Sequence, residues 1–100
     1  MPKKLPPIHP GEILLEEFLA PLGISRVRLA RDTSMPPSRV GKIIAGERGI
    51  SAETALRLGR YFGNTAQFWM NLQSRYDLRV AEHALHKTLD KEVAIHKAAG

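Results

Sequence analysis

The sequence contains no cysteine, which excludes disulfide bonds, zinc–thiolate sites and cysteine nucleophiles. Long apolar runs are also missing, since the longest have three residues, as in Ile13-Leu14-Leu15. Such runs are too short to cross a bilayer. The first twelve residues carry two lysines but no apolar stretch behind them, which is unlike a secretion signal. We therefore expect a cytoplasmic protein.

Strand-like alternation and internal repeats are absent as well, so we expect an all-α protein. One hundred residues can build one small core but not two, which predicts a single domain. Four prolines among the first ten residues favour an extended N-terminal arm at 1–9. The helical domain is expected at 10–82, followed by a C-terminal tail at 83–100 that is either helical or flexible.

Apolar residues recur at three- and four-residue steps in five segments, which predicts five helices, at 10–22, 26–32, 37–45, 52–62 and 65–81. The last helix can continue beyond Ala81. The residues expected to begin and end these helices are Pro10, Pro21 with Gly23, Ser25, the break Thr33–Pro36, Pro37, Gly46, Ser51, Gly63 and Asn64 or Thr65. Core candidates in the second, third and fourth helices are Val27, Leu29, Ala30, Val40, Ile43, Ile44, Ala55, Leu56, Leu58 and Phe62.

Charge is segregated along the chain, which carries a net charge of +5. Residues 10–22 contain three acids and no base, whereas residues 23–48 contain six bases against Asp32 and Glu47. A local excess of positive charge favours a polyanionic partner. A solvated face is at least as good an interpretation for Arg28 and Arg31. The six bases are Arg26, Arg28, Arg31, Arg39, Lys42 and Arg48.

Two short helices joined by a tight turn, over 25–46, form the pattern of a helix-turn-helix that binds double-stranded DNA. In the second of them, a step of about 100° per residue places the apolar residues on one side. Ser38, Lys42 and Ala45 then lie on the opposite side, with Arg39 on its edge. We predict that Ser38, Arg39 and Lys42 contact bases or phosphates in the major groove. A plain surface helix is the alternative.

Phosphate contacts are expected from the elements beside this helix. Ser25 and Arg26 stand at a helix N-terminus, where unpaired N–H groups and the helix dipole favour an anion. Arg48 lies in the loop after the predicted reading helix, and Ser51 opens the next helix. We therefore predict that Ser25, Arg26, Arg48 and Ser51 contact the DNA backbone.

Two-fold pairing is expected as well, because one copy of this size covers little DNA, and half-sites should then lie about 34 Å apart or a multiple of that. The predicted pairing surface is the fifth helix, with Phe68, Trp69, Leu72 and Tyr76. About half of these four residues are expected to close the core instead.

Two other classes of function compete with DNA binding. An enzyme or metal protein would have to use His9, His83, His86 and His96, but spacing places no third ligand beside His83 and His86. We expect no catalytic site, no metal and no cofactor. The second class is a protein-binding adaptor that has the fold but does not bind DNA.

Three separated segments, HPGEILLEEFLAPLGIS (9–25), ISAETALRLGRYFG (50–63) and FWMNLQSRYDL (68–78), closely resemble the HigA/VapI-type antitoxins. That family is a branch of the λ-repressor-like helix-turn-helix proteins. The resemblance covers about 6–82 and implies a five-helix fold, with a further C-terminal helix allowed. It also implies that the base-reading residues are Pro37, Ser38, Arg39 and Lys42, with Arg48 on phosphate. Pro36-Pro37 stands where relatives often carry polar residues.

The resemblance implies a homodimeric autorepressor that is the antitoxin of a type II toxin–antitoxin pair. Its toxin would be a HigB-like, RelE-fold mRNA endonuclease. Such toxins tend to be basic, so the acidic first helix (Glu12, Ile13, Glu16 and Glu17) is a candidate toxin contact, with an ordinary solvated face as the alternative. A stand-alone repressor without a toxin stays open, and a small toxin gene beside this one would decide between them.

Overall fold

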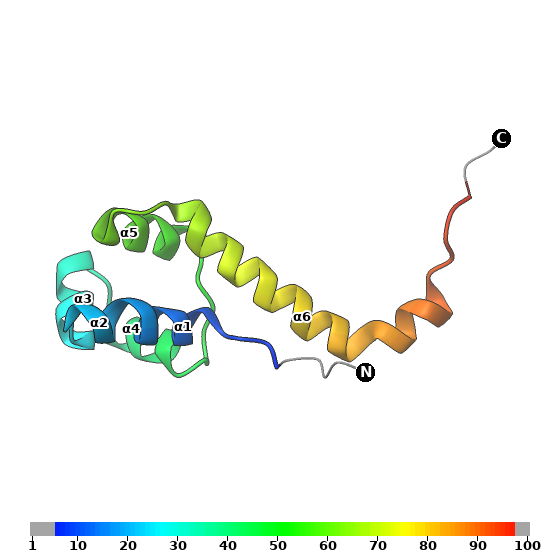
Figure 1. The fold of residues 1–100 in the computed structure, drawn as a ribbon, viewed down its shortest axis with the longest axis horizontal. Helices are drawn as coiled ribbons and strands as arrows, with labels where there is room; N and C mark the ends of the chain where they lie inside the picture. Colours follow the sequence, from blue (N-terminus) through cyan, green and yellow to red (C-terminus); the bar gives the residue numbers. More distant parts are fainter. Residues whose placement is uncertain (1–5, 98–100) are drawn as a thin grey trace.

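The computed structural model describes residues 6–97, and within that range it is all-helical. Seven helical segments follow one another: α1 (Pro10–Ile13), η1 (Leu14–Leu19), α2 (Ala20–Leu22), α3 (Arg26–Thr33), α4 (Pro37–Ile44), α5 (Ala52–Phe62) and α6 (Ala66–Glu92). The first three form one uninterrupted helical stretch, 10–22, so the prediction of five helices is confirmed. Figure 1 shows α1–α5 gathered at one end of the molecule and α6 extending away from them.

The first stretch contains a π-helical part, η1, that the sequence pattern did not predict. A proline ring collides with the carbonyl four residues earlier in a regular α-helix. Ahead of Pro21 the turns are wider, and the Ala20 N–H donates to the carbonyl of Leu15, five residues back. Pro21 therefore lies inside the last turn, and the expectation that it helps to end the helix was wrong. Gly23, in the left-handed conformation (φ 66°), ends it.

The two short helices expected at 25–46 are present as α3 and α4. Ser25 caps α3, because its Oγ accepts the Arg28 N–H at 3.0 Å. Thr33, expected in the break, instead closes α3, and its buried hydroxyl donates to the Leu29 carbonyl at 2.6 Å. Pro37 opens α4 as predicted, since a first-turn position needs no N–H.

The caps of the last two helices also agree with the sequence. Ser51 Oγ accepts the Thr54 N–H at 3.3 Å and begins α5, and Gly63 ends it with φ 72°. Thr65 Oγ1 accepts the Phe68 N–H at 3.0 Å and begins α6. This helix crosses the expected boundary at 82/83 without a break and ends at Glu92, so 83–92 continue the last helix.

The hydrophobic core lies between η1, α3, α4, α5 and the start of α6, and it contains most of the predicted residues. Val27 and Leu56 are corrections, because they are 70% and 64% exposed. Each side chain points roughly 110–130° away from the mean direction of the buried residues of its helix, given about 100° per residue. The buried apolar residues are Leu14, Leu19, Leu29, Ala30, Met35, Val40, Ile43, Ile50, Ala55, Leu58 and Trp69.

The start of the first helix packs closely on the end of α4. Gly11 is buried, and a Cβ atom at this position would overlap the backbone carbonyl of Ile43. His9 caps α1, since its Nδ1 accepts the Gly11 N–H at 2.9 Å, and its ring packs edge-on against Tyr76 of α6. The backbone at 6–9 is not helical; residues 1–5 of the expected arm and 98–100 of the expected tail lie outside the described residues. The close contact of Gly11 with Ile43 holds the end of α4 against α1.

Candidate nucleic-acid interface

The outer side of α4 has the composition that the sequence predicts. Val40 and Ile43 point inward and are each 1% exposed, whereas Ser38 and Lys42 are exposed. Pro37 is exposed too, at the first turn of the helix. A hydroxyl and an ammonium group therefore project from a helix whose apolar side is fully used in the core. These donors suit purine acceptors and phosphate oxygens.

Arg39 lies differently from the expectation that it reads bases beside Ser38 and Lys42. Its side chain is only 18% exposed, and its Nη1 lies 3.6 Å from Oε1 of Glu53 in α5. The Arg39 Nε is buried and has no hydrogen-bond partner within the described residues. The guanidinium is thus turned toward α5.

Glu53 binds a second arginine. Its Oε2 accepts from Arg57 Nε at 3.1 Å and lies 3.0 Å from Arg57 Nη2. Arg57 Nη1 also donates to the Thr33 carbonyl at 2.8 Å, at the end of α3. One carboxylate therefore links α4 to the end of α3 by way of α5. Sequence reasoning missed Arg57, because its contact with Thr33 joins residues 24 positions apart.

The flanking groups expected on phosphate fall into two kinds. Arg26 and Arg48 are exposed and take part in no ion pair within residues 6–97. The hydroxyl oxygens of Ser25 and Ser51 already accept backbone N–H groups, and Ser51 Oγ also donates to Thr54 Oγ1 at 3.2 Å. The two arginines are thus available to a polyanion, whereas the Ser51 hydroxyl already donates its proton to Thr54 Oγ1 within the helix cap.

The loop that carries Arg48 is fixed to α6. Gln73 Oε1 accepts the Ile50 N–H at 2.7 Å, and Ile50 itself is 3% exposed. The Gln73 amide also lies against Gly49, where an added Cβ would meet it at 3.0 Å. Gln73 therefore holds the segment between α4 and α5, and sequence reasoning missed it.

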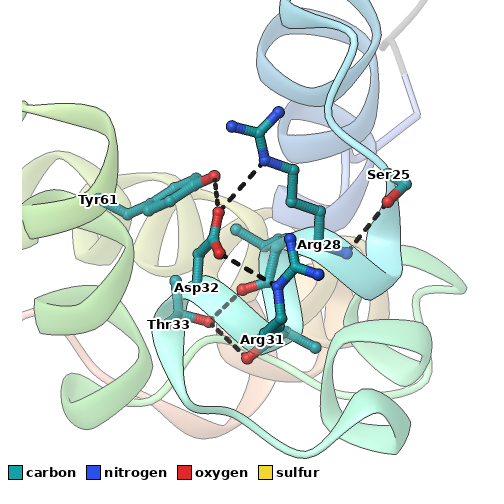
Figure 2. A network of polar contacts seen from close by, with 8 residues as sticks. Ser25, Arg28, Arg31, Asp32, Thr33 and Tyr61 are labelled. Atoms are coloured by element: carbon teal, nitrogen blue, oxygen red, sulfur yellow. Dashed lines mark hydrogen bonds and ion pairs between the residues drawn. The ribbon is translucent and has the colours of Figure 1, made fainter.

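Arg28 and Arg31, for which the sequence allowed either a DNA contact or a solvated face, belong to a polar cluster around Asp32 (Figure 2). Asp32 Oδ2 accepts from Tyr61 Oη at 2.8 Å and from Arg28 Nε at 3.3 Å, and Oδ1 lies 3.5 Å from Arg31 Nε. The Tyr61 hydrogen bond, with help from both arginines, holds the pKa of Asp32 below its usual value of 3.8. Arg28 and Arg31 are therefore partly neutralised, which agrees with the solvated-face interpretation.

The four residues predicted for the dimer or the core differ in burial. Trp69 is fully buried, with its Nε1 donating to Asn64 Oδ1 at 2.9 Å, and belongs to the core. Phe68 is 37% exposed. Leu72 and Tyr76 are half-buried and line a pocket between the arm, α1 and α6.

The acidic face on the first helix is present, since Glu12, Glu16 and Glu17 are exposed. Ile13 is half-buried and faces the pocket beside Tyr76. His83 and His86, the metal candidates, are exposed on the outer part of α6. Within residues 6–97, no three histidine or acidic side chains come together as a metal site. Nor does any helix in that range have the length and apolar character needed to cross a membrane.

Comparison with known proteins gives matches over most of the chain. The helix-turn-helix family model matches residues 15–69. The chain is 54% identical to virulence-associated protein I of Dichelobacter nodosus over 79 residues, which are 79% of this chain and 73% of that protein.

Two solved structures with bound DNA are also similar. The antitoxin HigA of Pseudomonas aeruginosa with the higBA promoter is 51% identical, with a TM-score of 0.85 over 88% of this chain and 96% of that chain. The antitoxin GraA in complex with its operator is 39% identical, with a TM-score of 0.88 over 98% and 99% of the two chains. Both structures share the overall arrangement of helices with this chain.

Proposed function

Because the chain belongs to the helix-turn-helix family, we propose that it is a sequence-specific, double-stranded DNA-binding repressor of its own operon. We also propose that it is the antitoxin of a type II toxin–antitoxin pair, which acts in the cytoplasm. The observation that carries the DNA-binding role is the outer side of α4, where Ser38 and Lys42 are exposed; Arg26 and Arg48, in the segments on either side in the sequence, are exposed as well. The HigA–promoter and GraA–operator structures support it, since both proteins are named antitoxins and both are bound to DNA.

The proposed roles follow from exposure and charge. Ser38 and Lys42, with Pro37 in van der Waals contact, approach the base edges in the major groove. Arg26 and Arg48 neutralise phosphates on either side. Ser25 offers a helix N-terminus as a further phosphate contact. The sequence also assigned Arg39 to bases and Ser51 to phosphate, but the ion pair of Arg39 and the capping bonds of Ser51 favour the other residues.

A second copy of the chain is the proposed partner in DNA binding, because a dimer matches two half-sites. Leu72 and Tyr76 line a pocket that is open at the surface, and Leu78, Leu85 and Leu89 form an exposed apolar row on another side of α6. An isolated helix gains little stability from its own hydrogen bonds, so the outer part of α6 needs a partner surface. We place the dimer contact along this row.

The proposed toxin is a HigB-like protein of the RelE fold. Glu12, Glu16 and Glu17 give the first helix an exposed negative face, which complements a basic RNA-cleaving protein. If reversing these three charges left toxin affinity unchanged, the contact would have to lie elsewhere. A stand-alone repressor would bind its operator but have no toxin gene beside it.

The test is a selection of duplexes that the protein binds, followed by titrations at two salt concentrations. Lys42→Ala should weaken binding to the selected operator by about fivefold or more, because one good base contact contributes about 1–3 kcal/mol. Lys87→Ala is the matched control, since Lys87 is exposed on the outer part of α6, away from α4. Equal binding by both variants would show that α4 does not face the DNA, and binding to no duplex would favour the adaptor function.

A further inference from the structure

The arginine that the sequence assigned to base reading has a different place in the structure. We infer that Arg39 is a positioning residue: through Glu53 and Arg57 it fixes α4 relative to the end of α3, and it does not contact DNA. The inference rests on the proposed DNA-binding function and concerns how the reading helix is held. The set Arg39, Glu53, Arg57 and the Thr33 carbonyl is called the polar strut below.

The strut is continuous from one helix to the next. Arg39 reaches from α4 to Oε1 of Glu53, at 3.6 Å. The other carboxylate oxygen of Glu53 binds Arg57, one turn further along α5, at 3.0–3.1 Å. The Glu53 carboxylate thus contacts two guanidinium groups, one with each of its oxygen atoms.

At the α3 end of the strut, Arg57 binds a backbone carbonyl that has no hydrogen-bond donor within its own helix. The last carbonyls of an α-helix have no intrahelical donor. Thr33 is the last residue of α3, and its carbonyl accepts from Arg57 Nη1 at 2.8 Å. Charge-assisted hydrogen bonds of this kind are directional. The strut therefore connects the C-terminal end of the first helix of the helix-turn-helix to the first turn of the second.

Apolar packing alone does not set this angle. Leu29 and Ala30 of α3 and Val40 and Ile43 of α4 are buried together, but apolar contacts are not directional. A polar connection at the edge of that packing limits how α4 can turn. Because Ser38 and Lys42 stand on the opposite side of α4, a small rotation would move both of them relative to the base edges.

The burial of Arg39 argues against a base contact in this arrangement. Its side chain is 18% exposed, whereas that of Glu53 is 58% exposed. Its Nε is closed off from solvent and has no acceptor. To contact DNA, the guanidinium would have to leave Glu53, whose carboxylate would then keep only Arg57 as a partner. The loss of the Arg39–Glu53 ion pair opposes such a contact.

The experiment is a double-mutant cycle with Arg39→Met and Glu53→Met, measured as operator affinity at several salt concentrations on the full-length protein. Each single variant should weaken operator binding by about fivefold. The double variant should bind no more weakly than the weaker single one, because the strut is already broken. The slope of log affinity against log salt should stay within about half a unit of the wild-type value, since no phosphate contact is lost.

The sign of the Glu53→Met effect is the sharpest result. Removing a negative charge beside DNA should strengthen binding if charge alone matters. Glu47→Met is the matched control, because Glu47 is exposed, lies in the loop after α4 and makes no ion pair among the described residues. Glu47→Met should strengthen binding slightly, and Glu53→Met should weaken it.

Two outcomes would overturn the inference. One is stronger binding by Glu53→Met, which would mean that Arg39 is released to the DNA. The other is an additive cycle in which Arg39→Met lowers the salt slope by about one in both backgrounds. Circular dichroism must show each variant folded at the assay temperature. A wild-type protein that binds no operator would refute the proposed function itself, before the cycle is measured.

Discussion

The two halves of the molecule are stabilised in different ways. In the body, 9–76, η1, α3, α4, α5 and the start of α6 place side chains in a common core, and polar contacts join residues as far apart as Asp32 and Tyr61. In the outer part of α6, 77–92, all residues but Thr88 are exposed, and the helix lies away from the other helices (Figure 1). The body holds α4 through contacts on several sides, whereas the outer part of α6 is the exposed surface on which we propose the dimer contact.

Among substitutions that test this comparison, the largest loss of stability is expected at Gly11, in the body. Gly11→Ala places a methyl group on the backbone carbonyl of Ile43, which no side-chain rotation can relieve. Overpacking of this kind costs up to about 3 kcal/mol. We expect a clear fall in the denaturant midpoint, together with weaker operator binding, because the end of α4 must move.

Gly41→Ala is the matched control for Gly11. Gly41 lies inside α4, and a Cβ there meets nothing within 4 Å. Since glycine is a poor helix former, alanine should raise the free energy of unfolding by about 0.5–1 kcal/mol. Equal effects of the two substitutions would contradict the close packing of α1 on α4.

A smaller effect, on assembly and not on the body, is expected from the outer part of α6. Leu85→Asp with Leu89→Asp places two charges in the exposed apolar row. We expect the dimer dissociation constant, measured by sedimentation, to rise at least about tenfold, with the near-ultraviolet signal of Trp69 unchanged. Operator affinity should fall accordingly.

The control introduces one of these charges elsewhere on the same segment. Lys87 is exposed and lies about 200° around the helix from Leu85. Lys87→Asp should leave the dissociation constant within about twofold of the wild-type value. A loss of the core signal in the leucine variant would show that the outer part of α6 also supports the body, and the comparison above would then be wrong.

The features that could be predicted from the sequence are local ones. Ser25, Ser51 and Gly63 end or begin helices through bonds within a few residues, and Pro37 needs only the backbone angle of a first helical turn. The apolar period likewise placed Val40 and Ile43 inside. It failed at Val27, because a short helix near its cap buries a narrower stripe than the apolar residues suggest.

The contacts that sequence could not supply are those that join distant side chains. A helical-wheel projection of α4 places Arg39 at the edge of the outer face. Whether its side chain turns outward depends on the neighbouring residue in α5, Glu53. Tyr61, which donates to Asp32, is 29 residues away from it in the sequence, and Gln73, which accepts from Ile50, is 23 residues away. Nothing in residue spacing distinguishes these pairs before the helices are packed.

The smallest expected effect is a pH dependence at the junction of the arm, α1 and α6. His9 Nδ1 accepts the Gly11 N–H, which a protonated ring cannot do. Burial lowers the pKa of His9 below its usual value of 6.5, and the carboxylates of Asp77 and Glu12 oppose this shift. The unfolded chain therefore takes up this proton at a higher pH than the folded chain does.

Stability from His9 should be complete above pH 6.5 and decline as the pH falls from 6.5 to the folded-state pKa. His9→Asn keeps a capping oxygen that does not titrate in this range. Subtracting the free energy of unfolding of this variant from that of the wild type should leave a value that is constant above pH 6.5 and falls below it. If this difference stayed constant across the whole pH range, the cap at His9 would contribute nothing to the pH dependence of stability.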